Sequence, residues 1–304
     1  MRNAKALVVG EALVDIVVPK RGDRKEIPGG SPANVALTLG RLDRDVQLLT
    51  WLGQDARGNL VKGHLEESNV RVMPESMGAQ KTSTALATLD ETGAATYEFD
   101  IEWQVPQIEI DEDTPVVHAG SIAATLEPGG SEVVQLLARA KEFATISYDP
   151  NARPSIMGDP ATAYERVKEL ISLADVVKTS DEDIEWLSGS ADIDAVAQSW
   201  LELGASLVVV TRGGEGSSAF ISGERIDMPA ADVKVVDTVG AGDSFMGGLI
   251  DALWSENMLG SGNRYALANI DRETVVRVLA RASSISAITV SRAGANPPWK
   301  KELA

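Results

Sequence analysis

The pattern of hydrophobic and polar residues predicts extended segments in the first third of the chain. Residues 6–9 form an all-apolar run of the kind that lies in the middle of a parallel sheet, and residues 46–52 form a second such run. Between 82 and 101, small, β-branched and aromatic residues alternate on both sides of a polar turn, which predicts a hairpin. Together with about 12–27, this hairpin is expected to form a small sheet that covers a binding site as a lid.

Beyond residue 105, short apolar runs alternate regularly with longer amphipathic segments. Strands and helices in alternation imply a parallel, doubly wound sheet. We therefore predict a single α/β domain over residues 1–304, with a mainly parallel sheet flanked by helices. The predicted strands are 116–118, 145–148, 176–179 and 207–210, and the predicted helices are 131–142, 160–173, 191–203 and 272–290.

Composition excludes several classes of function. The chain of 304 residues has 28 basic and 45 acidic side chains, a net charge of −17, which argues against binding nucleic acid or an anionic membrane. It contains no cysteine, and its two histidines, His64 and His118, are 54 positions apart, so disulfides, thiolate catalysis and a zinc site are not expected. We find no signal peptide and no apolar stretch near 18 residues, and therefore expect a cytoplasmic protein.

One glycine-rich stretch has the pattern of an anion site. Small residues at Gly240, Ala241 and Gly242 join a predicted extended run to an amphipathic helix predicted from residue 243. The start of a helix offers free N–H groups and the positive end of the helix dipole. Such a site suits a phosphoryl group that gains charge in a transition state. Asp243 lies at its edge, where it either takes a proton from a substrate hydroxyl or caps the helix.

The stretch from Asp237 to Ile250 resembles the C-terminal signature of the ribokinase-like (PfkB) family of carbohydrate kinases. In that family the aspartate that matches Asp243 is the catalytic base, and the amides that match Gly240, Ala241 and Gly242 form the anion hole. The resemblance favours catalysis over capping for this aspartate, and it implies a ribokinase-like α/β fold.

A second motif, Gly29-Gly30-Ser31-Pro32-Ala33-Asn34, precedes a predicted helix. The paired glycines permit close approach, and Asn34 offers both a donor and an acceptor to a polyol. The motif resembles the N-terminal signature of the same family, whose glycine pair and asparagine contact the sugar. Asp15 lies among apolar neighbours, so it has a donor partner, faces a cleft or is a solvent-accessible turn residue. The resemblance implies that it holds sugar hydroxyls.

Polar residues follow the predicted parallel strands, whose carboxyl ends share one crevice. Asp149-Pro150-Asn151 with Arg153 looks like the loop of fructokinases and ketodeoxygluconate kinases, and it makes Arg153 a candidate for substrate binding. Tyr97 on the predicted hairpin is another candidate for substrate binding, and the alternative is that its ring only packs against the sheet.

The resemblance also implies a nucleotide site for ATP. The segment 211–216 resembles the family's nucleotide loop, and small residues on the last predicted helix allow either close packing or a slot beside adenine. The family's Asn-x-x-Glu motif, tied to magnesium and phosphate, falls on Ser180 to Asp183 and departs at both ends. The candidate nucleotide-binding residues are Lys178, Ser180, Thr211, Gly213, Gly216 and Ser283.

Two ion sites are expected. Asp183 keeps a carboxylate, one methylene shorter than the family's glutamate, so contact with Mg²⁺ through water is the expectation. In relatives a monovalent cation such as K⁺ often lies between the loop after the last helix and the carbonyls near Asp237 and Val239, which makes this a candidate site.

We predict an ATP-dependent sugar kinase that is most like fructokinase and that phosphorylates fructose at its primary O6. A keto acid needs a cationic side chain to bind its carboxylate. Residues 82–101, where the predicted lid would touch the substrate, contain no Lys or Arg. The alternatives are a 2-keto-3-deoxygluconate kinase, a ribokinase, or a non-catalytic sugar or nucleotide sensor on the same fold. A dehydrogenase is disfavoured because no Gly-x-Gly-x-x-Gly follows the first strand. The expected partners are the sugar and ATP, without nucleic acid or membrane, and a homodimer is one option for the oligomeric state.

Overall fold

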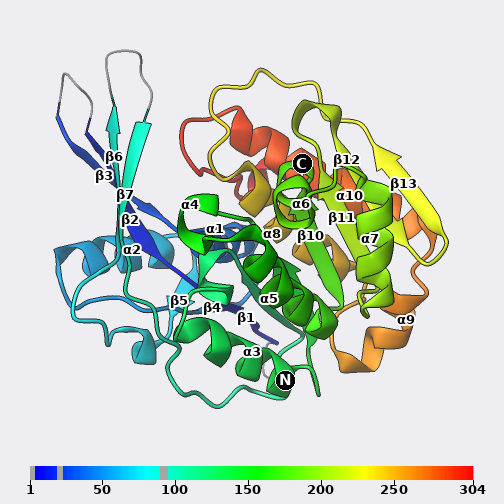
Figure 1. Cartoon of the computed structure of the whole chain (residues 1–304), viewed down its shortest axis with the longest axis horizontal. Coiled ribbons are helices and arrows are strands. Elements are labelled where there is room, and N and C mark those ends of the chain that lie inside the picture. Colours follow the sequence, from blue (N-terminus) through cyan, green and yellow to red (C-terminus); the bar gives the residue numbers. More distant parts are fainter. Residues whose placement is uncertain (1–3, 19–22, 90–94, 304) are drawn as a thin grey trace.

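The computed structural model describes residues 4–18, 23–89 and 95–303. Within these ranges the chain forms one nine-stranded sheet and one four-stranded sheet, with helices packed around the larger one (Figure 1). The order of the large sheet is β13-β12-β11-β10-β9-β8-β1-β4-β5. Its strands are β1 (Ala6–Val9), β4 (Val46–Leu49), β5 (Val70–Val72), β8 (Val116–Gly120), β9 (Thr145–Asp149), β10 (Val176–Ser180), β11 (Leu207–Thr211), β12 (Ser217–Ile221) and β13 (Glu224–Met228).

The direction in which the large sheet grows reverses at β1. From β1 the chain adds β4 and β5 on one side, and it then adds β8 and the strands after it on the other side. The strands from β5 to β11 are parallel, as the sequence predicts, whereas β12 and β13 are antiparallel. The reversal creates a topological switch point between the carboxyl ends of β1 and β8, the place where open α/β sheets bind their ligands.

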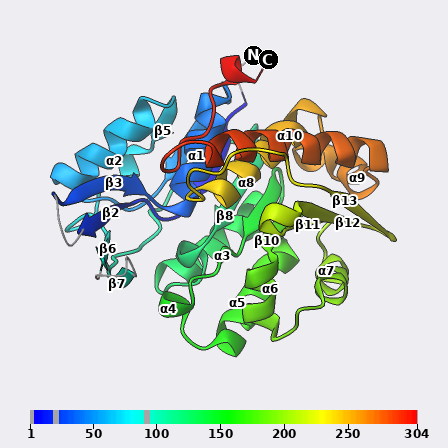
Figure 2. The ribbon, with the colours of Figure 1, turned by 90° about the horizontal axis from the view of Figure 1, so that it is seen from above.

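Helices cover both faces of the large sheet (Figure 2). One face carries α1 (Ser31–Arg41), α8 (Ala241–Ser255) and α10 (Arg272–Val290), and the other carries α3 (Gly129–Ala140), α5 (Pro160–Leu173), α6 (Asp181–Ser188) and α7 (Ile193–Glu202). Successive strand residues point to opposite faces, so Val209 joins the core under α8 while Val208 and Val210 join the core under α5. Among the described helices, none is both long and apolar enough to cross a membrane.

The other α-helices in the described part of the chain are α2 (Ala56–Glu66), α4 (Pro154–Met157) and α9 (Arg264–Ala268). The sequence predicted a strand-like run before the glycine-rich stretch, but residues 229–240 form an irregular segment in the described structure. This segment is anchored because the amides of Val236 and Asp237 both donate to the carbonyl of Val290. The helix that follows begins at Ala241, two residues before the predicted start.

The four-stranded sheet has the order β3-β2-β6-β7 and lies at one end of the large sheet. Its strands are β2 (Leu13–Val18), β3 (Lys25–Gly29), β6 (Thr84–Leu89) and β7 (Ala95–Asp100). The register places Asp15 beside Ala85 and Ala85 beside Phe99, so the three residues form one row on one face. A second, small sheet was predicted from these segments, and its function as a lid stays a prediction, as does the single-domain organisation.

Candidate active site

A cavity of about 360 Å³ lies between the small sheet and the N-terminal end of α8, and we call it the small-sheet cavity. The row of the small sheet formed by Asp15, Ala85 and Phe99 lines one side of it. Loops at the carboxyl ends of the large-sheet strands line another, as the doubly wound topology leads one to expect. The remaining lining residues are Glu11, Leu13, Gly30, Ser31, Asn34, Ser121, Ile122, Asn151, Arg153, Ile156 and residues 238–243.

A second cavity, of about 560 Å³, lies on the other side of the same helix start, and we call it the α10 cavity. Thr238, Ala241 and Gly242 line both cavities. Two molecules bound in the two cavities would therefore meet at the first turn of α8. The α10 cavity is also lined by Thr211, Gly213, Gly214, Gly216, Ala230, Ala231, Asp232, Val233, Val235, Phe245, Ser283, Ser286, Ala287 and Val290.

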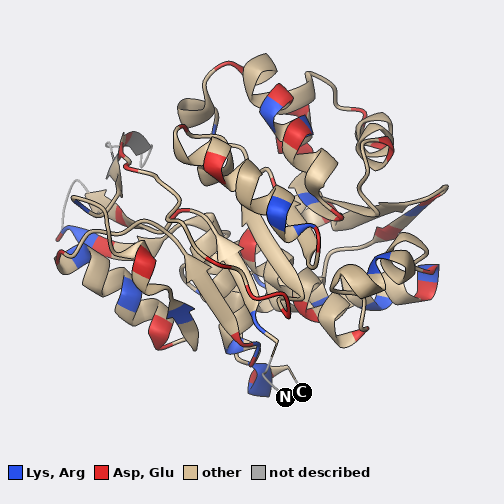
Figure 3. Cartoon of the chain, turned by 90° about the horizontal axis from the view of Figure 1, so that it is seen from below, with Lys and Arg blue, Asp and Glu red and all other residues tan. Residues whose placement is uncertain are grey.

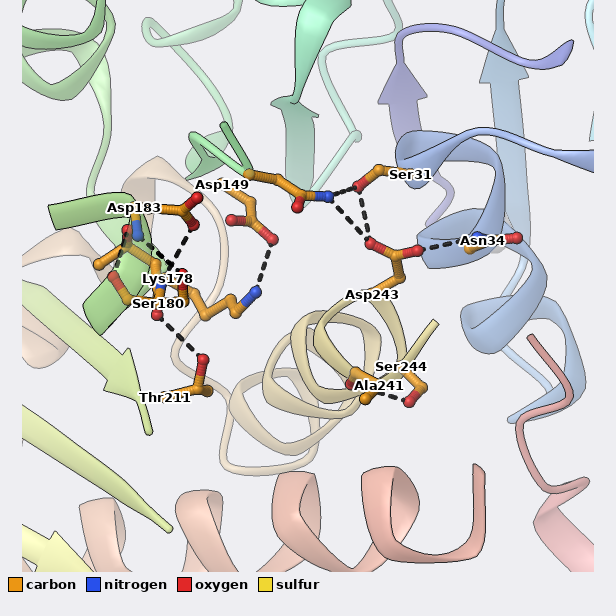
Figure 4. Close-up of polar contacts among 12 residues, drawn as sticks. Ser31, Asn34, Asp149, Lys178, Ser180, Asp183, Thr211, Ala241, Asp243 and Ser244 are labelled. Carbon is orange, nitrogen blue, oxygen red and sulfur yellow. Dashed lines mark hydrogen bonds and ion pairs between the residues drawn. The ribbon is translucent and has the colours of Figure 1, made fainter. Parts of the chain in front are cut away.

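Asp243 lies in the first turn of α8 with only 7% of its surface exposed. Its Oδ1 accepts hydrogen bonds from Ser31 Oγ at 2.7 Å and from Asn151 Nδ2 at 3.3 Å, and its Oδ2 accepts one from Asn34 Nδ2 at 2.8 Å (Figure 4). The residue at the N-cap position of α8 is Gly240, so Asp243 does not cap the helix. Its carboxylate is instead fixed at the wall of the small-sheet cavity by residues distant in sequence.

The glycine-rich turn before α8 needs small residues. Gly240 has a φ of 74°, and a Cβ there would lie 2.6 Å from the Cβ of Ala295. The amide of Ala241 donates to the carbonyl of Thr238 at 3.2 Å, whereas the amide of Gly242 belongs to the unpaired donors of a first helical turn. The turn can therefore offer backbone donors and the helix dipole to an anion.

Lys178 lies directly beneath this turn. A Cβ on Gly242 would be 2.9 Å from Lys178 Nζ, and that nitrogen is 2.9 Å from Asp149 Oδ2. Burial lowers the pKa of the ammonium, but the negative charge of the neighbouring Asp149 raises it by more. The net shift is upward, so Lys178 keeps its proton. Burial raises the pKa of Asp149 to about 6, against the attraction of Lys178, so the pair is ionised at neutral pH. The result is a buried positive charge beside the anion-binding turn.

Asp15 and Arg153 both line the small-sheet cavity. Burial raises the pKa of Asp15 to about 6, and the positive charge of Arg153 opposes this rise. A Cβ on Gly29 would lie 2.1 Å from Asp15 Oδ2, so a larger residue there would displace this carboxylate. The guanidinium of Arg153 folds back and donates to Oδ1 of Asn151 at 2.8 Å. Tyr97 belongs to β7, and its side chain lies outside the described residues.

Ser180 and Asp183 cap helix α6 reciprocally. Ser180 Oγ accepts the Asp183 amide at 3.0 Å, and Asp183 Oδ2 accepts the Ser180 amide at 3.2 Å. Oδ1 of Asp183 accepts the amide of Ala152 at 2.9 Å, which ties α6 to the loop after β9. Capping therefore accounts for this pair of residue types, and their contact with nucleotide or Mg²⁺ stays a prediction.

The predicted nucleotide-loop residues Thr211, Gly213 and Gly216 come together with Ser283 in the α10 cavity. Gly216 has a φ of 98°, and a Cβ there would lie 2.1 Å from the carbonyl oxygen of Met228. Glycine is thus required at this position by the close approach of β13. Contact of Thr211, Gly213, Gly216 and Ser283 with a nucleotide stays a prediction.

Asp237 joins the loop before α8 to the loop after α10. Its Oδ1 accepts the amide of Val239 at 3.0 Å, and its Oδ2 accepts the amide of Gly294 at 2.8 Å. These two hydrogen bonds lower the pKa of the carboxyl group. The predicted cation site at Asp237 and Val239 therefore lies on a well-anchored junction, and its occupancy stays a prediction.

Among the polar residues of the small-sheet cavity, Ser31, Asn151 and Glu11 were not predicted from the sequence as site residues. Ser31 and Asn151 lie within the quoted motifs, but their bonds to Asp243 depend on the packing of α1 and the β9 loop against α8. Glu11 is 6% exposed, and burial raises its pKa to about 7. A glutamate directly after an all-apolar strand was the signal that could have identified it, because ligands bind at the carboxyl ends of such strands.

The sequence model of one protein family, described as pfkB family carbohydrate kinase, matches residues 3–302. The chain belongs to the pfkB family of carbohydrate kinases. A fructokinase from Rhizobium leguminosarum bv. trifolii is 33% identical to this pfkB chain over 280 residues, which cover 88% of the chain and 85% of that protein. The family prediction and the kinase prediction are thereby confirmed.

Two solved structures of fructokinases resemble the chain along nearly its full length. Fructokinase from Xylella fastidiosa with bound ATP has a TM-score of 0.84 and 26% identity, covering 99% of this chain and 97% of that one. A double mutant of fructokinase from Vibrio cholerae O395 with bound fructose, ADP and potassium ion has a TM-score of 0.76 and 26% identity, covering 96% and 94%. The predicted ribokinase-like α/β fold is thus confirmed.

Proposed function

We propose that this pfkB kinase transfers the γ-phosphoryl group of ATP to the primary O6 hydroxyl of fructose and releases fructose 6-phosphate and ADP. The observation that carries the proposal is the position of Asp243, which lies where the two cavities share the first turn of α8. A donor and an acceptor held in such neighbouring sites react as if in one molecule.

The small-sheet cavity is the site we assign to the sugar. Asp15, Gly29, Gly30 and Asn34 surround or shape it, and we assign them the sugar hydroxyls, with Tyr97 and Arg153 as further contacts. The α10 cavity is the site we assign to ATP, with Thr211, Gly213, Gly216 and Ser283 along the nucleotide. Similarity to fructokinases solved with ATP, or with fructose and ADP, supports this division.

In the reaction, Asp243 takes the proton of O6 while O6 forms a bond to the γ-phosphorus and the bond from that phosphorus to the leaving ADP oxygen breaks. The amides of the 240–242 turn and the dipole of α8 stabilise the charge on the transferring group. Lys178 adds its positive charge from beneath the turn. These groups are fixed before reaction, so little reorganisation is needed.

The ion sites follow the same assignment. The described residues contain no group of three or more His, Cys, Asp or Glu side chains that could hold a metal. This suits Mg²⁺, which keeps several waters and takes phosphate oxygens as ligands. We assign Asp183 to it, through water, and we assign a K⁺ site to the junction at Asp237 and Val239, supported by the potassium ion in the Vibrio cholerae fructokinase. Bound Mg²⁺ would neutralise phosphate charge.

We propose no macromolecular substrate. Acidic and basic residues are interspersed on the helices (Figure 3), and the net charge of −17 disfavours nucleic acid and anionic membranes. An ATP-dependent reaction fits a cytoplasmic location. A homodimer is the oligomeric state we would test first, by light scattering.

The experiment that tests the proposal is ADP release with Mg-ATP and a panel of fructose, ribose and 2-keto-3-deoxygluconate, in KCl and in NaCl. Fructose should give the highest kcat/KM, and KCl should support the higher rate. A kcat/KM for ribose or the keto acid that is more than about tenfold above that for fructose would overturn the choice of sugar. Such a ratio corresponds to about 1.4 kcal/mol of stronger transition-state binding. No ADP release with any sugar would overturn the kinase reaction itself.

A further inference from the structure

Glu11 occupies the topological switch point of the large sheet. It follows β1, and its partners Ser121 and Ala123 follow β8, the strand next to β1. The side on which the chain adds strands changes between β1 and β8, although the two strands are parallel. The loops at their carboxyl ends therefore separate and open a crevice. Glu11 and Ser121 both line the small-sheet cavity at this crevice.

The side chain of Glu11 is held firmly in this position. Its Oε2 accepts the amide of Ala123 at 3.1 Å, and the neighbouring hydroxyl of Ser121 lowers the pKa of the carboxyl group. The helix α1 starts against its backbone, because a Cβ on Gly30 would lie 2.5 Å from the carbonyl oxygen of Glu11. Burial of a carboxyl group that is 6% exposed costs stability, and a function in ligand binding would account for its presence here.

The charges around this cavity favour an uncharged ligand. Glu11, Asp15 and Asp243 bring three carboxyl groups to it, and among its described lining residues Arg153 is the one with a cationic side chain. Arg153 already donates to oxygens of Asn151. The carboxylate of a sugar acid would therefore enter a cavity in which acidic side chains outnumber basic ones.

We propose that Glu11 is a specificity-determining residue, whose carboxyl group hydrogen-bonds a hydroxyl of the sugar at the switch point and rejects sugar acids. This inference rests on the proposed sugar kinase function. A site that pairs with a substrate hydroxyl rejects analogues that leave its buried polar group unpaired, and a like charge adds repulsion to that penalty. Asp243 acts at the reacting hydroxyl, and Glu11 acts at another part of the same sugar.

The test compares wild type with Glu11→Gln at pH 8, above the pKa of about 7 of this carboxyl group, so that the amide keeps the shape and removes the charge. We expect KM for fructose to rise about tenfold while kcat changes less than about threefold, because the lost contact is made in the bound sugar and in the transition state alike. Since the amide no longer repels a carboxylate, the ratio of kcat/KM for fructose to that for 2-keto-3-deoxygluconate should fall at least about tenfold.

Two further variants make the result decisive. Ser121→Ala removes the hydroxyl that stabilises the charged form of Glu11 and should shift the same ratio in the same direction by a smaller factor. Glu132→Gln is the matched control, because Glu132 also accepts a backbone amide, that of Val105 at 2.8 Å, from outside the residues that line the two cavities. It should leave the ratio unchanged.

An unchanged ratio in Glu11→Gln, or a loss of kcat at constant KM, would overturn the proposal. If Glu11→Gln does not fold, as judged by its melting curve, an unchanged ratio in Ser121→Ala overturns it and a lowered ratio supports it. The proposed function fails separately, because that failure would be seen in wild type as a preference for another sugar. The same variants then apply to the preferred neutral sugar.

Discussion

Asn34 donates a hydrogen bond from Nδ2 to Oδ2 of Asp243 at 2.8 Å, which joins the first turn of α1 to the first turn of α8. The two family motifs of the chain thus meet in one contact, although 209 positions separate these residues. Ser31 holds the other oxygen of the same carboxylate at 2.7 Å. With both oxygens held, Asp243 has a fixed orientation before any substrate binds.

Asp243→Asn should therefore preserve the fold and nucleotide binding and lower kcat at least about 100-fold, which is the usual contribution of a positioned base. The amide keeps the size of the side chain but cannot take a proton. ADP release measures kcat, and calorimetric titration measures ATP binding. The control is Asp159→Asn at the N-cap of α5, where asparagine caps about as well as aspartate, so kcat, ATP binding and stability should stay close to wild type. A variant that keeps more than a tenth of the wild-type kcat would remove Asp243 from the role of base.

The buried pair of Lys178 and Asp149 allows stability and catalysis to be separated. Lys178→Met leaves a buried carboxylate without its partner and should cost about 3–5 kcal/mol of unfolding free energy. Lys178→Met combined with Asp149→Asn removes both charges and should recover most of that loss. Its kcat should nevertheless stay about 100-fold below wild type, because the positive charge beneath the anion-binding turn is missing.

Chemical denaturation and ADP release on the same three variants, with Asp149→Asn as the third, check this expectation. The double variant separates the two possible roles of Lys178. If it recovers both stability and kcat, Lys178 serves only to neutralise Asp149, and the charge has no part in phosphoryl transfer. Recovery of most of the lost stability without recovery of kcat is the expected outcome.

The sequence was sufficient to predict the elements that depend on local pattern. The helix predicted at 272–290 and the strands of the parallel sheet follow from hydrophobic periodicity, and the family motifs at 29–34 and 237–250 predicted which loops meet. What could not be predicted depends on packing between distant segments. The Ser31 and Asn151 bonds to Asp243 arise only when three loops converge, and the antiparallel strands β12 and β13 follow a short Gly-rich turn that resembled a ligand loop.

Ser180 and Asp183 show a different limit of sequence reasoning. Their spacing matches both a kinase motif with two substitutions and an ordinary capping box, and the structure forms the capping box. A residue pair can satisfy local helix chemistry and still contact a ligand, so the spacing alone does not separate the two functions.

Asp15 should give a trade-off between stability and function. Its pKa is raised from 3.8 to about 6 by burial, so the folded state holds more protons than the unfolded state between these values. Stability from this group therefore falls as pH rises from about 4 to 6, and the penalty persists above pH 6. Asp15→Asn should raise the unfolding free energy at pH 8 by about 1–2 kcal/mol, less than the full shift because the side chain keeps some access to solvent.

Thermal melting at pH 8 and at pH 4 checks the sign. The stabilisation should be present at pH 8 and small at pH 4, where the folded-state carboxyl group is protonated and the pH lies close to the unfolded-state pKa of 3.8. KM for the sugar should rise at least about tenfold in the same variant, because the amide replaces an ionised acceptor of sugar hydroxyls. Equal melting temperatures at pH 8 would show that the buried carboxylate carries no penalty.

Hydrogen exchange can test whether the small sheet closes over the sugar. This sheet lines the cavity with Leu13, Asp15, Ala85 and Phe99, yet it lies outside the large sheet and its strand β3 is mostly exposed. Segments that move on binding come from the least stable parts of a fold. Fructose should therefore slow exchange of the amides of β2 and β6 by about tenfold or more, while β8 and β9 change little. The control is Asp15→Asn at the same fructose concentration, where weak binding should leave β2 and β6 unprotected. Protection that is equal in the small and large sheets would mean that the sugar stabilises the whole molecule without closing a lid.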